Sequence, residues 1–207
     1  MGRSTDVKAK FISDTTAADA DGLITSTTPG AGGAITLNGA QVSGGVASFG
    51  DNTARLITVT CGSDINARVF TITGTDANGD ALTDTITGVN ANTVSSSEYF
   101  LTVTEVSVDD GTGAAITVGM ADNALGVIFA GRTRIRGLQL SSGAATADVS
   151  FRNTSATGTE LLKFRTVGSA NGDQTFNIPS DGVVFSAGAY CAFTVGDFNS
   201  ITVFYDG

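Results

Sequence analysis

The 207-residue chain has no histidine and no tryptophan, and it has only two cysteines, two prolines and three tyrosines. Histidine is the commonest general acid–base group and a common metal ligand, so its absence excludes Ser-His-Asp and Cys-His catalytic centres. The missing tryptophan and the few tyrosines remove the amphipathic rings that most often form stacking surfaces. We therefore expect a non-enzymatic protein with no catalytic residue, no resident metal and no cofactor.

Charge is also scarce, and most of it is negative. Charged residues make up 15% of the chain, with 20 acidic and 11 basic side chains, a net charge of −9 and a pI near 4.2. An acidic surface repels the phosphates of nucleic acids and anionic lipids. We therefore expect no nucleic-acid partner and no membrane partner.

Long apolar runs are missing as well. No run approaches the roughly 18 residues that a membrane-spanning helix needs, and the first residues, MGRSTDVKAKF, lack the apolar core of a signal peptide. We expect the protein to be made and used in the cytosol. Cys61 and Cys191 lie in separate strand-like segments, so the preferred interpretation is two small apolar core residues, with a disulfide or a metal site as weaker alternatives.

The residues that are abundant favour strands and turns. Glycine, threonine, serine, alanine and valine dominate, and alternation of apolar and polar residues recurs from Ala34 to the end of the chain. In one such run Phe70 and Ile72 point one way, and the run is followed by Asn78-Gly79, a pair suited to tight hairpin turns. The pattern predicts an all-β protein of antiparallel strands.

The chain divides into three predicted parts. Residues 1–30 are polar and indicate an extended N-terminal arm, residues 31–128 a first β-domain, and residues 129–207 a C-terminal β-sandwich. We place the boundary where the strand spacing is interrupted, at residues 121–131. Seven short segments after it are typical of a sandwich or jelly roll: RIRGLQL, ADVSFRN, ELLKFRTV, QTFNI, GVVFS, AYCAFTV and NSITVFY.

Two stretches resemble structural proteins of tailed bacteriophages. The first is VFTITGTDANGDALTDTITGVNANTVSSSEYFLTVTEVSV, and the second combines TADVSFRNTSATGTELLKF, FNIPSDGVVFSAGAYCAFTV and the final ITVFY. The resemblance implies a virion component of the head decoration or cement type, located on the head surface and assembled in the host cytoplasm. It implies as partners the major capsid protein and further copies of the chain, as a dimer or trimer. It implies no active-site residues.

Other functions stay open at this point. A neck, tail or fibre protein that contacts the host is the main alternative, and a carbohydrate-binding adhesin module is a more remote one.

The local motif that most resembles a ligand-binding site consists of Asp76, Asn78 and Asp80. Their alternate spacing resembles the start of an EF-hand calcium loop, but Ala81 and Thr87 stand where that loop needs glycine and glutamate. The sequence therefore favours a turn with Asx-type hydrogen bonds, and weak calcium binding is the alternative.

Arg132, Arg134 and Arg136 alternate with uncharged residues, so a strand would place all three on one face. The preferred interpretation is a solvated face neutralised by nearby carboxylates. A docking surface for an acidic partner is the sharper hypothesis, because arginine binds carboxylates with two parallel hydrogen bonds. A contact between the two domains would explain the arginines equally well.

Overall fold

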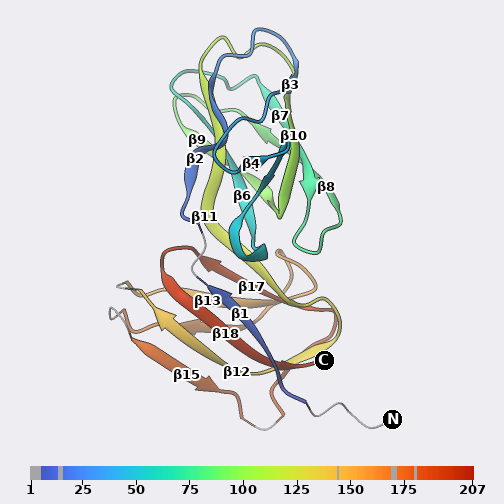
Figure 1. Ribbon diagram of the computed structural model, residues 1–207, viewed down its shortest axis with the longest axis vertical. Coiled ribbons are helices and arrows are strands. Elements are labelled where there is room, and N and C mark those ends of the chain that lie inside the picture. The colour runs from blue at the N-terminus through green and yellow to red at the C-terminus, as the bar shows by residue number, and fades with distance from the viewer. Residues whose placement is uncertain (1–5, 14–15, 144, 169–171, 180) are drawn as a thin grey trace. The chain divides into compact units, whose positions relative to one another are not determined.

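The computed structural model describes residues 6–13, 16–143, 145–168, 172–179 and 181–207. The described chain is almost entirely β-strand, which confirms the predicted fold class, and its helical part is a short 3₁₀ turn, η1 (Gly50–Asn52). No helix in this part of the chain is long and apolar enough to cross a membrane. Cα proximity divides the chain into an N-terminal unit, Ala17–Asp122, and a C-terminal unit that combines Met1–Thr16 with Asn123–Gly207 (Figure 1).

The N-terminal unit is built from two sheets. Its strands are β2 (Asp19–Thr27), β3 (Gly33–Ile35), β4 (Val42–Ser43), β5 (Val46–Ser48), β6 (Ala54–Cys61), β7 (Val69–Thr75), β8 (Ala81–Thr87), β9 (Thr93–Phe100), β10 (Thr102–Val108) and the first part of β11 (Ile116–Phe129). One sheet has the order β4-β5-β10-β7-β8, with β3 also paired to β10. In the other, β6 lies between β9 and β11, and β2 pairs with β11.

Side chains from both sheets fill the core of this unit. Phe70 and Ile72 on β7 have no exposed surface, as the alternation in the sequence predicts, and they belong to the same apolar cluster as Val59 on β6 and Val118 on β11. Burying large apolar side chains in this way is the main favourable contribution to folding. The unit therefore has a sandwich core of its own.

The predicted hairpin at Asn78-Gly79 is confirmed. Strands β7 and β8 pair antiparallel without a break from Val69 opposite Thr87 to Thr75 opposite Ala81. Gly79 has φ +89°, a left-handed conformation that glycine adopts without strain.

The free edges of β8 and β9 are joined through one carboxylate. Oδ2 of Asp84 on β8 accepts hydrogen bonds from the backbone N–H groups of Ser97 (2.8 Å) and Glu98 (3.1 Å) and from the Ser97 hydroxyl (3.0 Å). Partial burial raises the pKa of Asp84, but these bonds and one from the Thr85 N–H outweigh it, so the pKa lies below its ordinary value. Asp84 thus ties the two sheets together and satisfies exposed strand-edge donors.

The C-terminal unit also has two sheets. Its strands are β1 (Lys8–Ser13), the second part of β11, β12 (Thr133–Ser142), β13 (Asp148–Asn153), β14 (Glu160–Arg165), β15 (Asp173–Asn177), β16 (Val183–Phe185), β17 (Ala189–Thr194) and β18 (Phe198–Asp206). One sheet has the order β1-β18-β12-β15, with β16 also paired to β12, and the other has the order β14-β13-β17-β11. All seven segments predicted after residue 129 are strands, β12 to β18.

A second apolar cluster fills this unit. Leu138 and Leu140 on β12 and Val203 on β18 contribute from one sheet, while Val149 and Phe151 on β13 contribute from the other, and none has exposed surface. Cys61 and Cys191 are free thiols, one buried in each cluster, which confirms their prediction as core residues. Burial raises the pKa of the Cys191 thiol and so suppresses its reactive thiolate form.

Two predictions about organisation need correction. Most of the described residues of the expected arm at 1–30 lie instead in strands: β1 pairs antiparallel with β18, and β2 pairs with β11. Residues 1–5 and 14–15 of that segment lie outside the described residues. No interruption of strand structure occurs over most of 121–131, because β11 continues to Phe129. The units divide after Asp122, which lies within the predicted boundary range but before residue 128.

Candidate interaction surfaces

Asp76, Asn78 and Asp80 form the turn between β7 and β8, and this turn is held by Asx-type hydrogen bonds. Oδ1 of Asp76 accepts bonds from the backbone N–H groups of Asn78 (2.8 Å) and Asp80 (2.9 Å), while the Asp76 carbonyl accepts one from Gly79 (3.0 Å). Oδ2 of Asp76 accepts a longer bond from Nδ2 of Asn78, at 3.4 Å. Among the described residues, no group of three or more His, Cys, Asp or Glu side chains is placed to hold a metal ion. The Asx-type hydrogen bonds that the sequence favours are therefore present in this turn.

Two of the three arginines lie on one strand and alternate with buried residues, as the sequence predicts. Arg134 and Arg136 lie in β12, but Arg132 precedes the strand, in an exposed turn. Nη1 of Arg134 lies 3.5 Å from Oδ2 of Asp181, and Nη1 of Arg136 lies 3.2 Å from Oδ2 of Asp206. Both carboxylates belong to the C-terminal unit, so two of the arginines are neutralised locally, as the preferred interpretation predicts.

A β-bulge sets the direction of Arg136. Ile135 pairs with Tyr205 of β18 and Gly137 pairs with Phe204, so Arg136 is an extra residue in the ladder. A bulge shifts the alternation of side chains by one. Ile135 before the bulge and Leu138 after it both face the buried side of the sheet, while Arg136 stays partly exposed.

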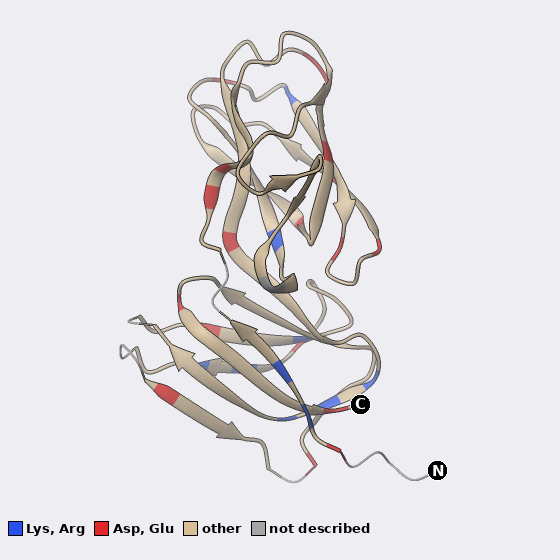
Figure 2. Ribbon diagram, in the orientation of Figure 1, with Lys and Arg blue, Asp and Glu red and all other residues tan. Residues whose placement is uncertain are grey.

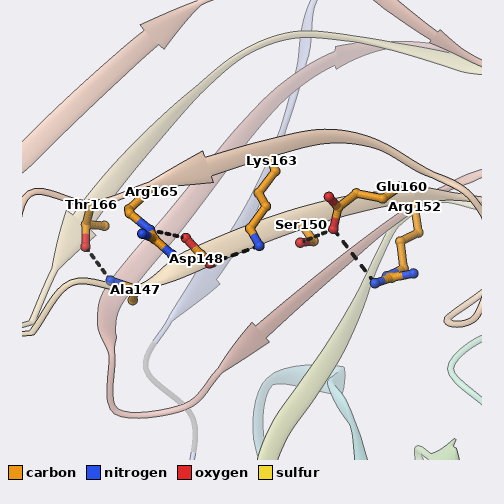
Figure 3. Close-up of polar contacts among 8 residues, drawn as sticks. All are labelled: Ala147, Asp148, Ser150, Arg152, Glu160, Lys163, Arg165 and Thr166. Carbon is orange, nitrogen blue, oxygen red and sulfur yellow. Dashed lines mark hydrogen bonds and ion pairs between the residues drawn. The ribbon is translucent and has the colours of Figure 1, made fainter.

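A row of charged pairs covers the exposed side of β13 and β14, at the edge of their sheet (Figure 3). Arg165 binds Asp148 through two parallel hydrogen bonds, Nε to Oδ1 at 2.7 Å and Nη2 to Oδ2 at 3.0 Å, and Lys163 Nζ lies 3.0 Å from Oδ2. Further along the same strands, Glu160 accepts a hydrogen bond from Ser150 at 2.6 Å and lies 3.8 Å from Arg152.

The two cations change the acidity of Asp148. Hydrogen bonds from Arg165 and then Lys163 hold the pKa of this carboxyl well below its ordinary range, and the pKa of Arg165 is raised in turn. Charged side chains along an edge strand also discourage pairing with another chain. This row therefore protects the β14 edge.

The other sheet of the C-terminal unit ends at strand β1, and this edge carries an exposed aromatic side chain. Strand β1 is the terminal strand of its sheet, and Phe11 on it is 62% exposed. Lys8 reaches across to the carbonyl of Gly207 at 2.9 Å and lies 5.8 Å from the centre of the Phe129 ring. Lys8 pairs with Tyr205 and Phe11 with Thr202, so these two side chains of β1 lie on opposite faces of the sheet.

A small cavity lies among the loops of the N-terminal unit. Its volume is about 260 Å³, and it is lined by residues 64–68 and Thr112. Arg68 at its wall is 3.6 Å from Asp110. The lining mixes hydrogen-bond donors and acceptors with the apolar side chains of Ile65 and Ala67, and the volume lies just below the range typical of small-molecule sites.

Sequence reasoning identified the arginines but missed Phe11, Asp148 and Lys163. Phe11 lay within the predicted arm, and its exposure follows from its place on a terminal strand. Asp148 and Arg165 stand opposite each other across β13 and β14. That pairing could have been anticipated only with the register of the two strands in hand.

No protein family and no curated protein matches the chain. Among solved structures, a similar one is the allantoicase of Saccharomyces cerevisiae, with a TM-score of 0.30 and 6% sequence identity over 78% of this chain and 76% of that one. A likeness this distant carries no argument about function.

Proposed function

We propose that this chain is a structural protein of a tailed-bacteriophage particle, and that it decorates the outer surface of the head and stabilises the shell. The observation that carries the proposal is the resemblance of VFTITGTDANGDALTDTITG and the GVVFSAGAY region to phage virion proteins. The roles of the ionisable residues support a binding function. Asp76 holds a turn, Asp84 joins two sheets, and Asp148, Arg134 and Arg136 form ion pairs on strand surfaces.

A decoration protein acts by mass action. A ligand that binds the intact shell but not the disrupted shell stabilises the shell by an amount that grows with its concentration and affinity. Many copies on one particle multiply this effect. The partners are then the major capsid protein and neighbouring copies of the chain.

The test is to add the purified protein to particles from which it has been removed. We expect it to rebind and to raise the temperature at which the particles release their genome. Rebinding with no gain in thermal or mechanical resistance would refute the stabilising role, and failure to rebind would refute the head location.

A neck, tail or fibre protein that contacts the host is the second candidate. The cavity lined by residues 64–68 and Thr112 favours it, because loops at the end of a β-sandwich commonly carry receptor contacts. Copy number separates the two functions. Hundreds of copies per particle indicate decoration, and about a dozen or fewer indicate a neck or tail position.

A further inference from the structure

The sheet of order β1-β18-β12-β15 has one side on the apolar core of the C-terminal unit and one side turned away from it. Ile12 and Ile201 pair with each other and are buried in the core cluster, so the residues that alternate with them lie on the outer side. Two neighbouring rows of paired residues cross this outer side, and we call their eight residues the uncharged face. They are Phe11, Thr202, Gln139 and Thr175 in one row, and Ala9, Phe204, Gly137 and Asn177 in the other.

The uncharged face differs from the outer side of the other sheet of the same unit. Its eight residues are all uncharged, whereas β13 and β14 display the row of ion pairs in Figure 3. Phe11 is 62% exposed, and Phe204 is partly exposed between Ala9 and Gly137, the two smallest residues of the face. Few charges together with exposed aromatic rings distinguish the centre of a protein interface from the rest of a surface. The uncharged face therefore has the composition of a protein-binding surface.

The charges that border the uncharged face are of both signs. On one side Arg134 stands opposite Asp206, and Nη1 of Arg134 lies 3.5 Å from Oδ2 of Asp181, while Nη1 of Arg136 lies 3.2 Å from Oδ2 of Asp206. On the other side the bordering row has serines on β1, β18 and β12 and the carboxylate of Asp173 on β15. A strongly acidic or strongly basic partner gains little from such a border, because its charges meet both signs.

The net charge of each unit decides which unit can meet its own copy. Ala17–Asp122 contains twelve acidic and two basic residues, a net charge of −10, whereas Met1–Thr16 and Asn123–Gly207 together contain eight acidic and nine basic residues, a net charge of +1. Figure 2 shows this division as blue segments concentrated in the C-terminal unit. Like charges across an interface cost several kcal/mol. Two copies therefore repel each other through their N-terminal units but not through their C-terminal units.

The edge of the same sheet is protected against pairing with another chain. Strand β1 is its terminal strand, and Lys8 and Lys10 lie on the side of β1 that faces the core, as Ile12 does. Inward-pointing charges on an edge strand discourage the addition of a further strand. A contact between two copies is therefore favoured at the face of this sheet and not at its β1 edge.

We propose that two copies of the chain associate through the uncharged face of the C-terminal unit. A two-fold contact places the same surface on both sides, so that surface must be complementary to itself. Uncharged polar groups and two aromatic rings, bordered by charges of both signs, meet this condition, and two sheets packed about 10 Å apart bury such side chains between them. Because the proposed function includes neighbouring copies as partners, this dimer rests on it and supplies the surface through which they meet.

Sedimentation equilibrium of the purified full chain over a range of concentrations tests the dimer. We expect the mass of the wild type to rise with concentration from 20.8 kDa toward twice that value. Phe11→Glu and Gln139→Glu each bring like charges from both copies into one contact, so each should raise the dissociation constant of the dimer about tenfold or more. Val167→Glu is the matched control, because Val167 is 66% exposed and lies just beyond β14, in the other sheet. Circular dichroism melting of each variant confirms that it is folded.

A mixture of Gln139→Glu and Gln139→Lys distinguishes a second copy from any other partner. Each variant alone brings like charges together, whereas the mixture joins opposite charges, so we expect mixing to restore association. The two-fold contact is overturned if mixing restores nothing. The uncharged face is overturned as the site if Phe11→Glu and Gln139→Glu associate as tightly as the wild type, and the dimer itself is overturned if the wild type stays at 20.8 kDa at every concentration.

Rebinding to stripped particles separates the dimer from the proposed function. A wild type that forms dimers but does not rebind refutes the proposed function and leaves the dimer standing. A wild type that stays monomeric and rebinds, with rebinding lost in Phe11→Glu, assigns the uncharged face to the shell and overturns the second copy as its occupant.

Discussion

Arg55 is a charged side chain buried in the N-terminal unit. Its Nε and Nη2 both donate hydrogen bonds to the carbonyl oxygen of Ala121, at 2.9 and 2.6 Å. Burial lowers the pKa of Arg55, and the negative charge of Asp122 opposes that effect. The guanidinium thus fixes the residues of β11 at which the N-terminal unit ends.

Replacing Arg55 tests this role. Arg55→Ala removes both hydrogen bonds and leaves a cavity, so we expect the free energy of unfolding to fall by about 3 kcal/mol. Arg68→Ala is the control, because a partly exposed ion pair contributes little, and we expect a change within about 0.5 kcal/mol. Denaturant unfolding followed by circular dichroism measures both, and equal effects would contradict the structural role of Arg55.

Asp148 gives a prediction about pH. Its pKa is lower in the folded protein than the ordinary 3.8, because Arg165 and Lys163 donate hydrogen bonds to the ionised form. A group of this kind stabilises the fold above its ordinary pKa, and the contribution is lost as the pH falls through the lowered pKa. We therefore expect Asp148→Asn to lower the melting temperature at neutral pH and to have little effect in strong acid.

NMR titration of the side-chain carboxyl carbons measures the pKa of Asp148 directly. The titration midpoint of Asp148 should lie below 3.8, and a midpoint at or above that value would contradict the assignment. The exposed Asp173 on β15 offers a matched variant, Asp173→Asn, which we expect to change the melting temperature at neutral pH much less than Asp148→Asn does.

At the scale of elements, Asp84 joins two strand edges that belong to different sheets. Asp84→Asn keeps the shape but removes the charge and replaces one acceptor with a donor, so the N–H groups of Ser97 and Glu98 lose a strong partner. We expect a loss of about 2 kcal/mol and faster hydrogen exchange at these two amides. Glu105→Gln, on an exposed position of β10, should change neither.

The elements also show what the sequence can predict. The hairpin of β7 and β8 was predictable, because strict alternation around Phe70 and Ile72 and an Asn-Gly turn act together in a short stretch of chain. Strand β1 was not, since only Ile12 of its side chains is buried and its lysines give it the character of a polar arm. Its strand structure comes from β18, about 190 residues away along the chain.

The candidate surfaces, too, could be predicted only where the residues that form them are close together in the sequence. The turn at Asp76 is local and was predicted correctly, whereas the pairing of Arg136 with Asp206 depends on β18 lying beside β12. The burial of Arg55 depends on the carbonyl of Ala121, 66 residues away. Contacts of this kind are fixed by strand order, which one sequence does not reveal.

At the scale of the whole molecule, each unit has its own apolar core and its own buried thiol, Cys61 in one and Cys191 in the other. These are the only two cysteines in the chain, so labelling by a thiol reagent reports separately on the opening of each unit. A buried thiol reacts only when the structure around it opens.

We expect the two cores to open independently. Phe70→Ala and Phe151→Ala each remove a fully buried ring, at a cost of about 3–5 kcal/mol to the unit that contains it. Phe70→Ala should therefore speed labelling of Cys61 about 100-fold or more and leave Cys191 unchanged, and Phe151→Ala should do the reverse, while the exposed Phe11→Ala changes neither. Peptide mapping by mass spectrometry after timed labelling distinguishes the two thiols. If either core substitution accelerates both thiols equally, the chain unfolds as one cooperative body and the division into two stable units is wrong.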